Sequence, residues 1–403
     1  MGKYSLTNEN NGLPRTLYKK AQINITSYPG IWKYIDWLPV DNVLNGFNGG
    51  CVTYKSSGLS KELGLNNLYI AFNGYWPEIN ADLNTCSFKD LEAGPTVEML
   101  HEKKEKRILT VASAGNTARA FANACHLADI PLLLVVPKNS ISKLWIPEET
   151  PIDGIFLLCV DGDYSEAIEV SNKICELREF VPEGGAKNIA RRDGMATVML
   201  DGAFKIGRIP DYYFQAVGSG TGGISAWEAS MRLISDGRFG SRLPVLKLAQ
   251  NIPCAPLFNS LHGGVYNKDC PRGMYDSVLF NRKPPYSIPG GVAEALKDTN
   301  GTIDGMTNEQ AEKASQIFYK AEGADIMNAA AIAVAALIYN CETEKINKDD
   351  TVLLNITGGG EALYKKEKSI KYLQPDMTVK PENADINEIS KKIIDKLEAS
   401  IYA

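Results

Sequence analysis

The stretch of sequence that decides the fold is Tyr212–Gly223, Y-Y-F-Q-A-V-G-S-G-T-G-G, followed by an apolar run over Ile224–Ile234. Tyr212–Val217 is typical of a buried β-strand, and the run after the glycines is typical of a helix. Between a strand and a helix, glycines let backbone N–H groups converge on an anion, and the helix N-terminus adds partial positive charge. The motif lacks the Lys-Ser/Thr ending of a nucleotide-binding P-loop. We therefore expect a phosphate-binding loop, the alternative being a simple tight turn, at Gly218, Ser219, Gly220, Thr221, Gly222 and Gly223.

The alternation of short apolar runs and longer amphipathic runs extends along the chain. Strands are expected at 107–112, 131–136, 155–160 and 352–356, and helices at 115–128 and 164–178. Strands that alternate with helices indicate βαβ units and parallel sheets, so we predict an α/β fold. Because the 403 residues exceed one ordinary domain of roughly 100–200 residues, we expect two domains. The irregular segment 253–291 is long for a loop, and we interpret it as a functional or interface excursion.

Composition excludes several classes of protein. With 43 Lys and Arg against 48 Asp and Glu, the formal net charge is −5, which argues against a general nucleic-acid binder. No two of the eight cysteines form a C-x-x-C pair, so we expect reduced thiols, without a zinc ribbon or a disulfide scaffold. The apolar runs Ile130–Pro137 and Ala329–Tyr339 are too short to span a bilayer, and the first residues do not resemble a signal peptide. We therefore expect a soluble, cytoplasmic protein without a nucleic-acid or membrane partner.

A lysine, Lys89, lies in the small and polar stretch T-C-S-F-K-D (85–90), where an amphipathic run begins. A buried amine that is often deprotonated can form a Schiff base with an aldehyde cofactor. The alternative is a solvated lysine near a helix start, because lysine is mostly a surface residue. From these residues alone, Lys89 is a candidate and no more.

Two further polar loops follow expected strands. S-A-G-N-T (113–117) offers a helix N-terminus with hydroxyl and amide donors, which suits a carboxylate, although Ser and Asn are also favoured as plain helix caps. L-N-I-T-G-G-G (354–360) offers the Thr357 hydroxyl to a ring nitrogen, and its glycines allow close approach of a flat ligand. A strand-to-helix turn is the alternative for this second loop.

Taken together, these motifs resemble those of the pyridoxal-phosphate enzymes of the tryptophan-synthase-β type, and in particular of the threonine synthase branch. Within the branch they are most similar to the cysteate synthase family. The matching words, spread over about 30–360, are T-C-S-F-K-D-L-E-A (85–93), S-A-G-N-T-A-R-A-F-A (113–122), V-P-E-G-G-A-K-N-I-A-R-R-D-G-M (181–195), F-Q-A-V-G-S-G-T-G-G-I-S-A-W-E-A-S (214–230) and P-P-Y-S-I-P-G-G (284–291).

The resemblance implies the fold called type II among pyridoxal-phosphate enzymes. This fold consists of two three-layer αβα domains with mostly parallel sheets and the cofactor in the cleft between them. The implied ranges are 1–94 for an N-terminal segment and the first part of the large domain, 95–205 for a smaller, mobile domain, and 206–403 for the rest of the large domain.

The resemblance also assigns roles to the motif residues. Lys89 is implied to carry pyridoxal phosphate as a Schiff base and then to act as the base at the substrate Cα. The backbone of 218–223 is implied to hold the cofactor phosphate, Asn116 the ring hydroxyl, and Thr357 the ring nitrogen. Ser113, Gly115 and Thr117 are implied to take the substrate carboxylate. No metal is inferred, since residues 5–12 carry no cysteine where such chains often have a cysteine-bearing knuckle.

The leaving group needs an anion site of its own, and a basic segment is the candidate. Arginine favours bidentate contact with phosphate, whereas a solvated basic helix end is the alternative. The resemblance favours the anion site, with substrate contacts at Lys187, Asn188, Arg191 and Arg192. One departure from the branch is I-M-N-A-A-A (326–331), which lacks the Pro and Ser that are common there and leaves the contribution of this segment open.

The activity that the resemblance implies is β-replacement. O-phospho-L-serine loses phosphate to give an aminoacrylate, and sulfite adds at Cβ to give L-cysteate. Both substrates are anions, which suits a cationic site inside an acidic protein. Homodimers are usual in this superfamily, and we expect one here. The alternatives are threonine synthase acting on O-phosphohomoserine, β-replacement on phosphoserine with another nucleophile, and a cofactor-bearing protein that is not an enzyme.

Overall fold

The strand that precedes the glycine loop lies in the middle of a six-stranded sheet. A computed structural model of the chain describes residues 2–7, 11–262, 273–281, 284 and 286–401. The six strands follow the order β14-β13-β12-β15-β4-β3 and are parallel except at the edge pair β3–β4. Their bounds are β3 (Val52–Lys55), β4 (Asn67–Phe72), β12 (Tyr212–Ala216), β13 (Val245–Asn251), β14 (Thr302–Met306) and β15 (Thr351–Ile356).

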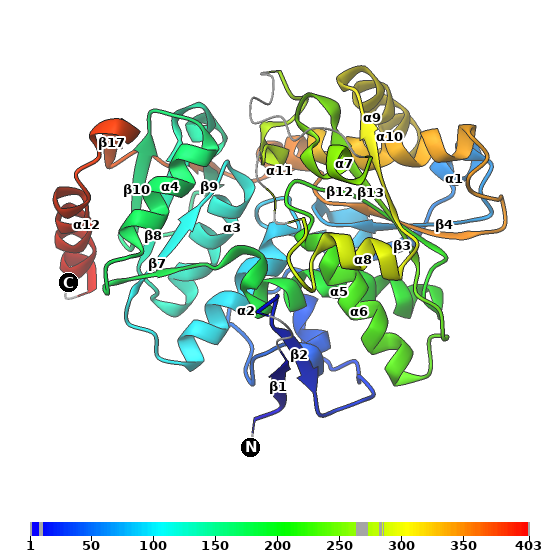
Figure 1. Cartoon of the computed structure of the whole chain (residues 1–403), viewed down its shortest axis with the longest axis horizontal. Coiled ribbons are helices and arrows are strands. Elements are labelled where there is room, and N and C mark those ends of the chain that lie inside the picture. Colours follow the sequence, from blue (N-terminus) through cyan, green and yellow to red (C-terminus); the bar gives the residue numbers. More distant parts are fainter. Residues whose placement is uncertain (1, 8–10, 263–272, 282–283, 285, 402–403) are drawn as a thin grey trace.

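A smaller, five-stranded sheet lies beside the larger one (Figure 1). Its order is β11-β7-β8-β10-β17, and all of its pairs are parallel. Its strands are β7 (Ile108–Ala112), β8 (Leu132–Pro137), β10 (Ile155–Val160), β11 (Phe180–Pro182) and β17 (Met377–Val379). Every residue of β8 and β10 is buried, which explains their continuous apolar sequences, since parallel strands are covered on both faces.

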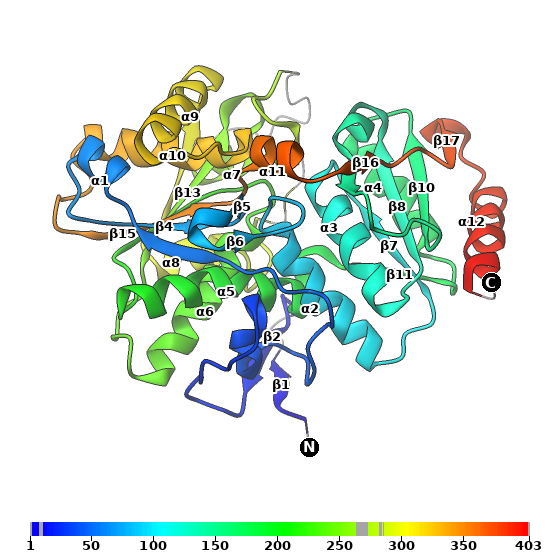
Figure 2. The same cartoon turned by 180° about the vertical axis from the view of Figure 1, so that it is seen from behind.

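Helices cover both faces of each sheet (Figures 1 and 2). In Figure 1, α9 and α10 lie above the larger sheet and α5 and α6 below it, while α3 and α4 lie on opposite faces of the smaller sheet. The helices are α1 (Gly58–Leu63), α2 (Lys89–Glu102), α3 (Asn116–Cys125), α4 (Tyr164–Ile174), α5 (Ile189–Ile206), α6 (Thr221–Asp236), α7 (Pro256–Leu261), α8 (Val292–Asp298), α9 (Asn308–Glu322), α10 (Asn328–Glu342), α11 (Glu361–Glu367) and α12 (Ile386–Ile401). The expected α/β class with mostly parallel sheets is therefore confirmed.

In the described part of the chain, three short antiparallel strand pairs lie outside the two sheets. They are β1 (Tyr4–Thr7) with β2 (Arg15–Tyr18), β5 (Tyr75–Trp76) with β6 (Ala81–Asp82), and β9 (Trp145–Pro147) with β16 (Ile370–Tyr372). The hairpin of β1 and β2 lies at the lower edge of the protein in Figure 1. Its Tyr18 hydroxyl donates to Asp193 on α5 at 2.7 Å, which fastens the hairpin to the helices under the larger sheet.

The chain crosses between the two sheets more than once. It passes from α2, under the larger sheet, to β7, and returns from β11 to α5, which packs against α2 and α6. After α11 it crosses again, so that β17 pairs with β10 and α12 packs on the outer side of the smaller sheet. The residue ranges expected for the two domains remain a prediction. In the C-terminal part of the chain, β14 and β15 belong to the larger sheet and β17 belongs to the smaller sheet.

Two observations bear on the expected cellular setting. Of the described cysteines, Cys254 is disulfide-bonded, so the expectation of reduced thiols throughout is wrong for this residue. The free thiols are Cys51, Cys86, Cys125, Cys159, Cys175 and Cys341. In the part of the chain that the structure describes, no helix combines the length and the apolar character needed to cross a membrane.

Candidate active site

All four sequence motifs meet at a pocket of about 110 Å³. The larger sheet supplies the loop after β12 and the end of β15, the smaller sheet supplies the loop after β7, and the start of α2 lies between them. These are carboxyl ends of parallel strands, where open α/β sheets bind their ligands. The expected site residues that line the pocket are Lys89, Ser113, Gly115, Asn116, Thr117, Arg191, Gly218, Ser219, Gly220, Thr221, Gly222 and Thr357.

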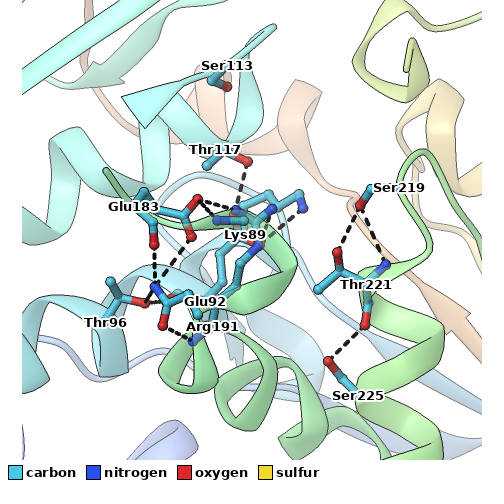
Figure 3. A network of polar contacts seen from close by, with 12 residues as sticks. Lys89, Glu92, Thr96, Ser113, Thr117, Glu183, Arg191, Ser219, Thr221 and Ser225 are labelled. Atoms are coloured by element: carbon cyan, nitrogen blue, oxygen red, sulfur yellow. Dashed lines mark hydrogen bonds and ion pairs between the residues drawn. The ribbon is translucent and has the colours of Figure 1, made fainter. Parts of the chain in front are cut away.

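The glycine loop turns directly into the first turn of α6. The helix begins at Thr221, three residues before the expected start, so its N-terminal amides lie at the pocket. The Ser219 and Thr221 hydroxyls lie 2.9 Å apart beside those amides (Figure 3). A Cβ added at Gly222 would lie 2.0 Å from Nε2 of Gln215, so a side chain there would displace the pocket wall. The loop therefore has the donors and the open backbone that fit a phosphate.

The last glycine of the motif has a different function. Gly223 does not line the pocket, and a Cβ at this position would lie 2.8 Å from the Leu248 side chain of β13. Its small size lets α6 pack closely against the larger sheet. The sequence motif thus combines a ligand loop and a packing position.

Lys89 is the first residue of α2, and its amine faces into the pocket. Its side chain is 21% exposed, and Nζ lies 3.1 Å from the Glu92 carboxylate one turn later. Burial lowers the pKa of the Lys89 amine, while the negative charge of Glu92 acts in the opposite direction. An amine of lowered pKa has a larger neutral fraction, which is the form that attacks an aldehyde.

The S-A-G-N-T loop leads from β7 into the first turn of α3 and lines the pocket. The Ser113 hydroxyl accepts hydrogen bonds from the backbone N–H of Gly115 at 3.1 Å and of Ala118 at 3.0 Å. The Thr117 hydroxyl donates to Oε1 of Glu92 at 2.9 Å (Figure 3). The two interpretations of this loop are thus compatible, because the Ser113 hydroxyl accepts the N–H of Ala118 in the first turn of α3, whose N-cap residue is Gly115, while the loop lines the pocket.

The amide of Asn116 is oriented by a buried arginine. Nη2 of Arg119, whose residue is 1% exposed, donates to Oδ1 of Asn116 at 3.0 Å and to the backbone oxygen of Thr85 at 3.0 Å. Because Oδ1 is occupied, Nδ2 of Asn116 is the end of the amide that faces the pocket, where it lies 3.7 Å from Sδ of Met327. A donor in this position suits an oxygen on a ligand ring.

Thr357 follows β15, is 7% exposed, and lies on the pocket lining. Its backbone oxygen accepts a hydrogen bond from the N–H of Phe88 at 3.0 Å, and Ser87 forms a β-bridge with Gly358. The lysine segment and the T-G-G-G segment are therefore joined by backbone hydrogen bonds, although 270 positions separate Ser87 from Thr357 in the sequence.

Of the four residues expected at the anion site, Arg191 alone lines the pocket. Lys187 is exposed, and Asn188 caps α5 by accepting the N–H of Arg191 at 3.2 Å. Arg192 is 1% exposed and pairs through Nε with Glu228 at 3.1 Å, on the side of α5 away from the pocket. Successive residues of a helix point about 100° apart, and in α5 this turn directs Arg191 to the pocket and Arg192 to Glu228 on α6.

The sequence did not point to several residues at or beside the pocket. Glu92 could have been found, because a carboxylate three residues after Lys89 shares its helix face. Tyr164 and Gln215 had no local signal, because one is the first residue of a helix and the other lies inside a buried strand. Two segments whose contribution the sequence left open also line the pocket. Segment 326–331 contributes Met327 and Ala329, and segment 253–291 contributes Val278, Leu279, Phe280 and Asn281. Residues 263–272, 282–283 and 285 of the excursion lie outside the described residues.

Comparisons with known proteins agree with this geometry. Residues 48–358 match the family model described as "Pyridoxal-phosphate dependent enzyme". A cysteate synthase from Methanococcoides burtonii is 52% identical over 98% of this chain and 94% of its own length. A cysteate synthase from Methanothrix thermoacetophila is 50% identical over 91% of this chain and 90% of its own. Among solved structures, maize serine racemase superposes with a TM-score of 0.59 at 16% identity, covering 78% of this chain and 92% of that one, which shows a shared fold.

Proposed function

The chain belongs to the pyridoxal-phosphate-dependent enzymes and, within them, to the cysteate synthase family, and we propose that it converts O-phospho-L-serine and sulfite into L-cysteate and phosphate. The observation that carries this proposal is the meeting of Lys89, the glycine loop and the S-A-G-N-T loop at one pocket of a chain that is 52% identical to a cysteate synthase.

The pocket fits pyridoxal phosphate in the kinds of donor that it presents. The first turn of α6 and the Ser219 and Thr221 hydroxyls would hold the phosphate, and Lys89 would bond to the aldehyde carbon. Nδ2 of Asn116 and the Thr357 hydroxyl would meet the ring oxygen and the ring nitrogen. When bound, this cofactor withdraws electrons from the Cα of an attached amino acid, which allows a group to leave from Cβ.

Lys89 would then move the proton at the substrate Cα. Its burial favours the neutral amine, so Nζ can accept that proton and later return it to Cα. Between these two steps the bond from Cβ to the phosphate oxygen breaks, and its electron pair leaves with phosphate. The lone pair on the sulfur of sulfite then forms the new bond to Cβ.

The two anionic ends of phosphoserine would bind on opposite sides of Lys89. The backbone of the Ser113–Thr117 loop would take the carboxylate at the start of α3, and Arg191 on α5 would face the phosphate. Nη1 of Arg191 lies 2.7 Å from Glu183 and Nη2 lies 3.2 Å from Glu92, so its plane is fixed before any substrate arrives. Fixed orientation lowers the cost of binding an anion.

Arg191→Lys is expected to raise the KM for phosphoserine about 10-fold, because lysine cannot make a bidentate contact to phosphate. The affinity for pyridoxal phosphate is expected to change less than threefold, because the cofactor phosphate is held by the glycine loop. Steady-state kinetics and a cofactor titration measure the two quantities. An equal loss of apparent affinity for phosphoserine and for pyridoxal phosphate would show that Arg191 has a structural role in the pocket.

Substrate pairs separate this proposal from threonine synthase. The purified holoenzyme is given phosphoserine or phosphohomoserine, each with and without sulfite, and phosphate release and the amino-acid product are measured. We expect sulfite-dependent cysteate from phosphoserine. Threonine formed from phosphohomoserine would overturn the proposal. If phosphoserine were consumed only with another nucleophile, that nucleophile would take the place of sulfite in the proposed reaction.

We also propose that the enzyme works as a cytoplasmic homodimer. The support is that homodimers are usual in the superfamily that the motifs resemble, and that the composition is typical of a soluble globular protein. Light scattering on the purified holoenzyme measures the mass directly, and a monomer mass of 44.1 kDa at working concentration would overturn the dimer.

A further inference from the structure

A fully buried carboxylate, that of Glu92, lies directly beneath Lys89. Its side chain is 0% exposed, and it points into the same group of polar contacts as the lysine amine (Figure 3). Oε2 lies 3.1 Å from Nζ of Lys89 and 3.2 Å from Nη2 of Arg191, while Oε1 accepts the Thr117 hydroxyl at 2.9 Å. Burial of a carboxylate is costly unless its partners compensate, so three partners at one carboxylate require an explanation.

These partners come from three separate parts of the site. Lys89 lies on α2, Thr117 on α3 of the smaller sheet, and Arg191 on α5 below the larger sheet. If the role of Glu92 were only to neutralise Arg191, Glu183 would already do so at 2.7 Å. The contacts that Glu183 does not duplicate are those with the Thr117 hydroxyl and the Lys89 amine, and of these two groups the amine is the one that carries charge.

A charge count around Lys89 indicates what that contact does. The charged groups that face the amine are Glu92 on its own helix and Arg191 and Glu183 from the segment between β11 and α5. Tyr164 at the start of α4 also faces this group, and burial raises its pKa to about 12, so its hydroxyl is neutral at working pH. With a neutral amine, two carboxylates oppose one guanidinium, and a proton on Lys89 restores the balance.

We propose that Glu92 is a positioning residue that fixes the Lys89 amine between α2 and Arg191 and stabilises its protonated form while Lys89 carries the substrate proton. Burial favours the neutral amine that captures the cofactor, and Glu92 favours the ammonium that exists after proton transfer. This inference rests on the proposal that Lys89 binds the cofactor. It does not depend on the identity of the amino-acid substrate or of the nucleophile.

The test measures how the apo-protein captures pyridoxal phosphate as a function of pH. The capture rate, followed by the absorbance change, rises as the Lys89 ammonium loses its proton. Glu92→Gln keeps the size of the side chain but removes the charge that favours the ammonium, so the midpoint of the rate profile should move to lower pH by about 1 unit or more. Glu183→Gln is the matched control, since it removes a carboxylate that contacts Arg191 and acts on Lys89 only from a greater distance, and its midpoint should move less than half as far.

The possible outcomes are distinct. A Glu92→Gln midpoint equal to that of the wild type, or a Glu183→Gln midpoint shifted as far, overturns the inference. If Glu92→Gln does not fold by circular dichroism, Glu92→Asp, which keeps the charge but withdraws it by one methylene, should show a smaller shift in the same direction, and no shift overturns the inference. Unchanged capture by Lys89→Ala would instead refute the lysine assignment in the proposed function.

Discussion

Replacing Lys89 with alanine is expected to abolish covalent attachment of the cofactor and to lower turnover by about 10³-fold or more. Lys89 is the amine that the structure places at the pocket between the glycine loop and the S-A-G-N-T loop. Its loss removes both the bond to the cofactor aldehyde and the base at Cα. The fold should survive, because the Lys89 side chain lies at the pocket surface and is 21% exposed.

Borohydride reduction followed by intact-mass measurement tests this directly. The wild-type chain should gain the mass of one reduced cofactor, and Lys89→Ala should gain none. Lys103→Ala is the matched control, because Lys103 is an exposed lysine at the other end of α2, and it should trap cofactor as the wild type does. Trapping that persists in Lys89→Ala would show that another lysine carries the cofactor.

Arg192→Ala is expected to lower the free energy of unfolding by about 3–5 kcal/mol, although its neighbour Arg191 faces the pocket. Arg192 is 1% exposed, pairs with the buried Glu228, and donates to the backbone oxygens of Ala186 and Pro14. Its removal leaves the Glu228 carboxylate and both carbonyls without these donors inside the protein. The same change would also loosen the attachment of the N-terminal segment to α5.

Urea unfolding followed by circular dichroism measures this cost. Arg178→Ala is the control, because Arg178 pairs with Glu179 while its side chain is 94% exposed, and solvent screening leaves such a surface pair with little effect on stability. If Arg192→Ala kept its stability and lost affinity for phosphoserine instead, Arg192 would belong to the anion site that the sequence predicts.

Three of the four motifs were informative by position, because each of them follows an expected strand. Loops at the carboxyl ends of neighbouring parallel strands lie at one edge of a sheet, which explains why Gly218–Gly223 and Thr357 lie together after β12 and β15. Ser113–Thr117 follows β7 of the smaller sheet, and only the resemblance to a known family placed it at the same site. The start of α6 at Thr221 was missed, because glycines discouraged the assignment of a helix there. Because of that error, the sequence did not show that Gly222 lines the pocket whereas Gly223 packs against the larger sheet.

Other features depend on contacts that no local pattern encodes. The adjacent arginines Arg191 and Arg192 look equivalent in sequence, and only the packing of α5 between α2 and α6 decides which of them faces the pocket. The return of the chain to the smaller sheet depends on the pairing of the three-residue strand β17 with β10. A strand this short has no recognisable periodicity.

Replacement of phosphate at Cβ by sulfite can be followed in a single labelling experiment. The holoenzyme is given phosphoserine and sulfite that carries a heavy sulfur isotope, and released phosphate and labelled products are measured together. We predict one labelled cysteate for each phosphate released, with phosphate release that depends on sulfite. Phosphate release at the same rate without sulfite, together with pyruvate and no labelled cysteate, would show elimination and contradict the account.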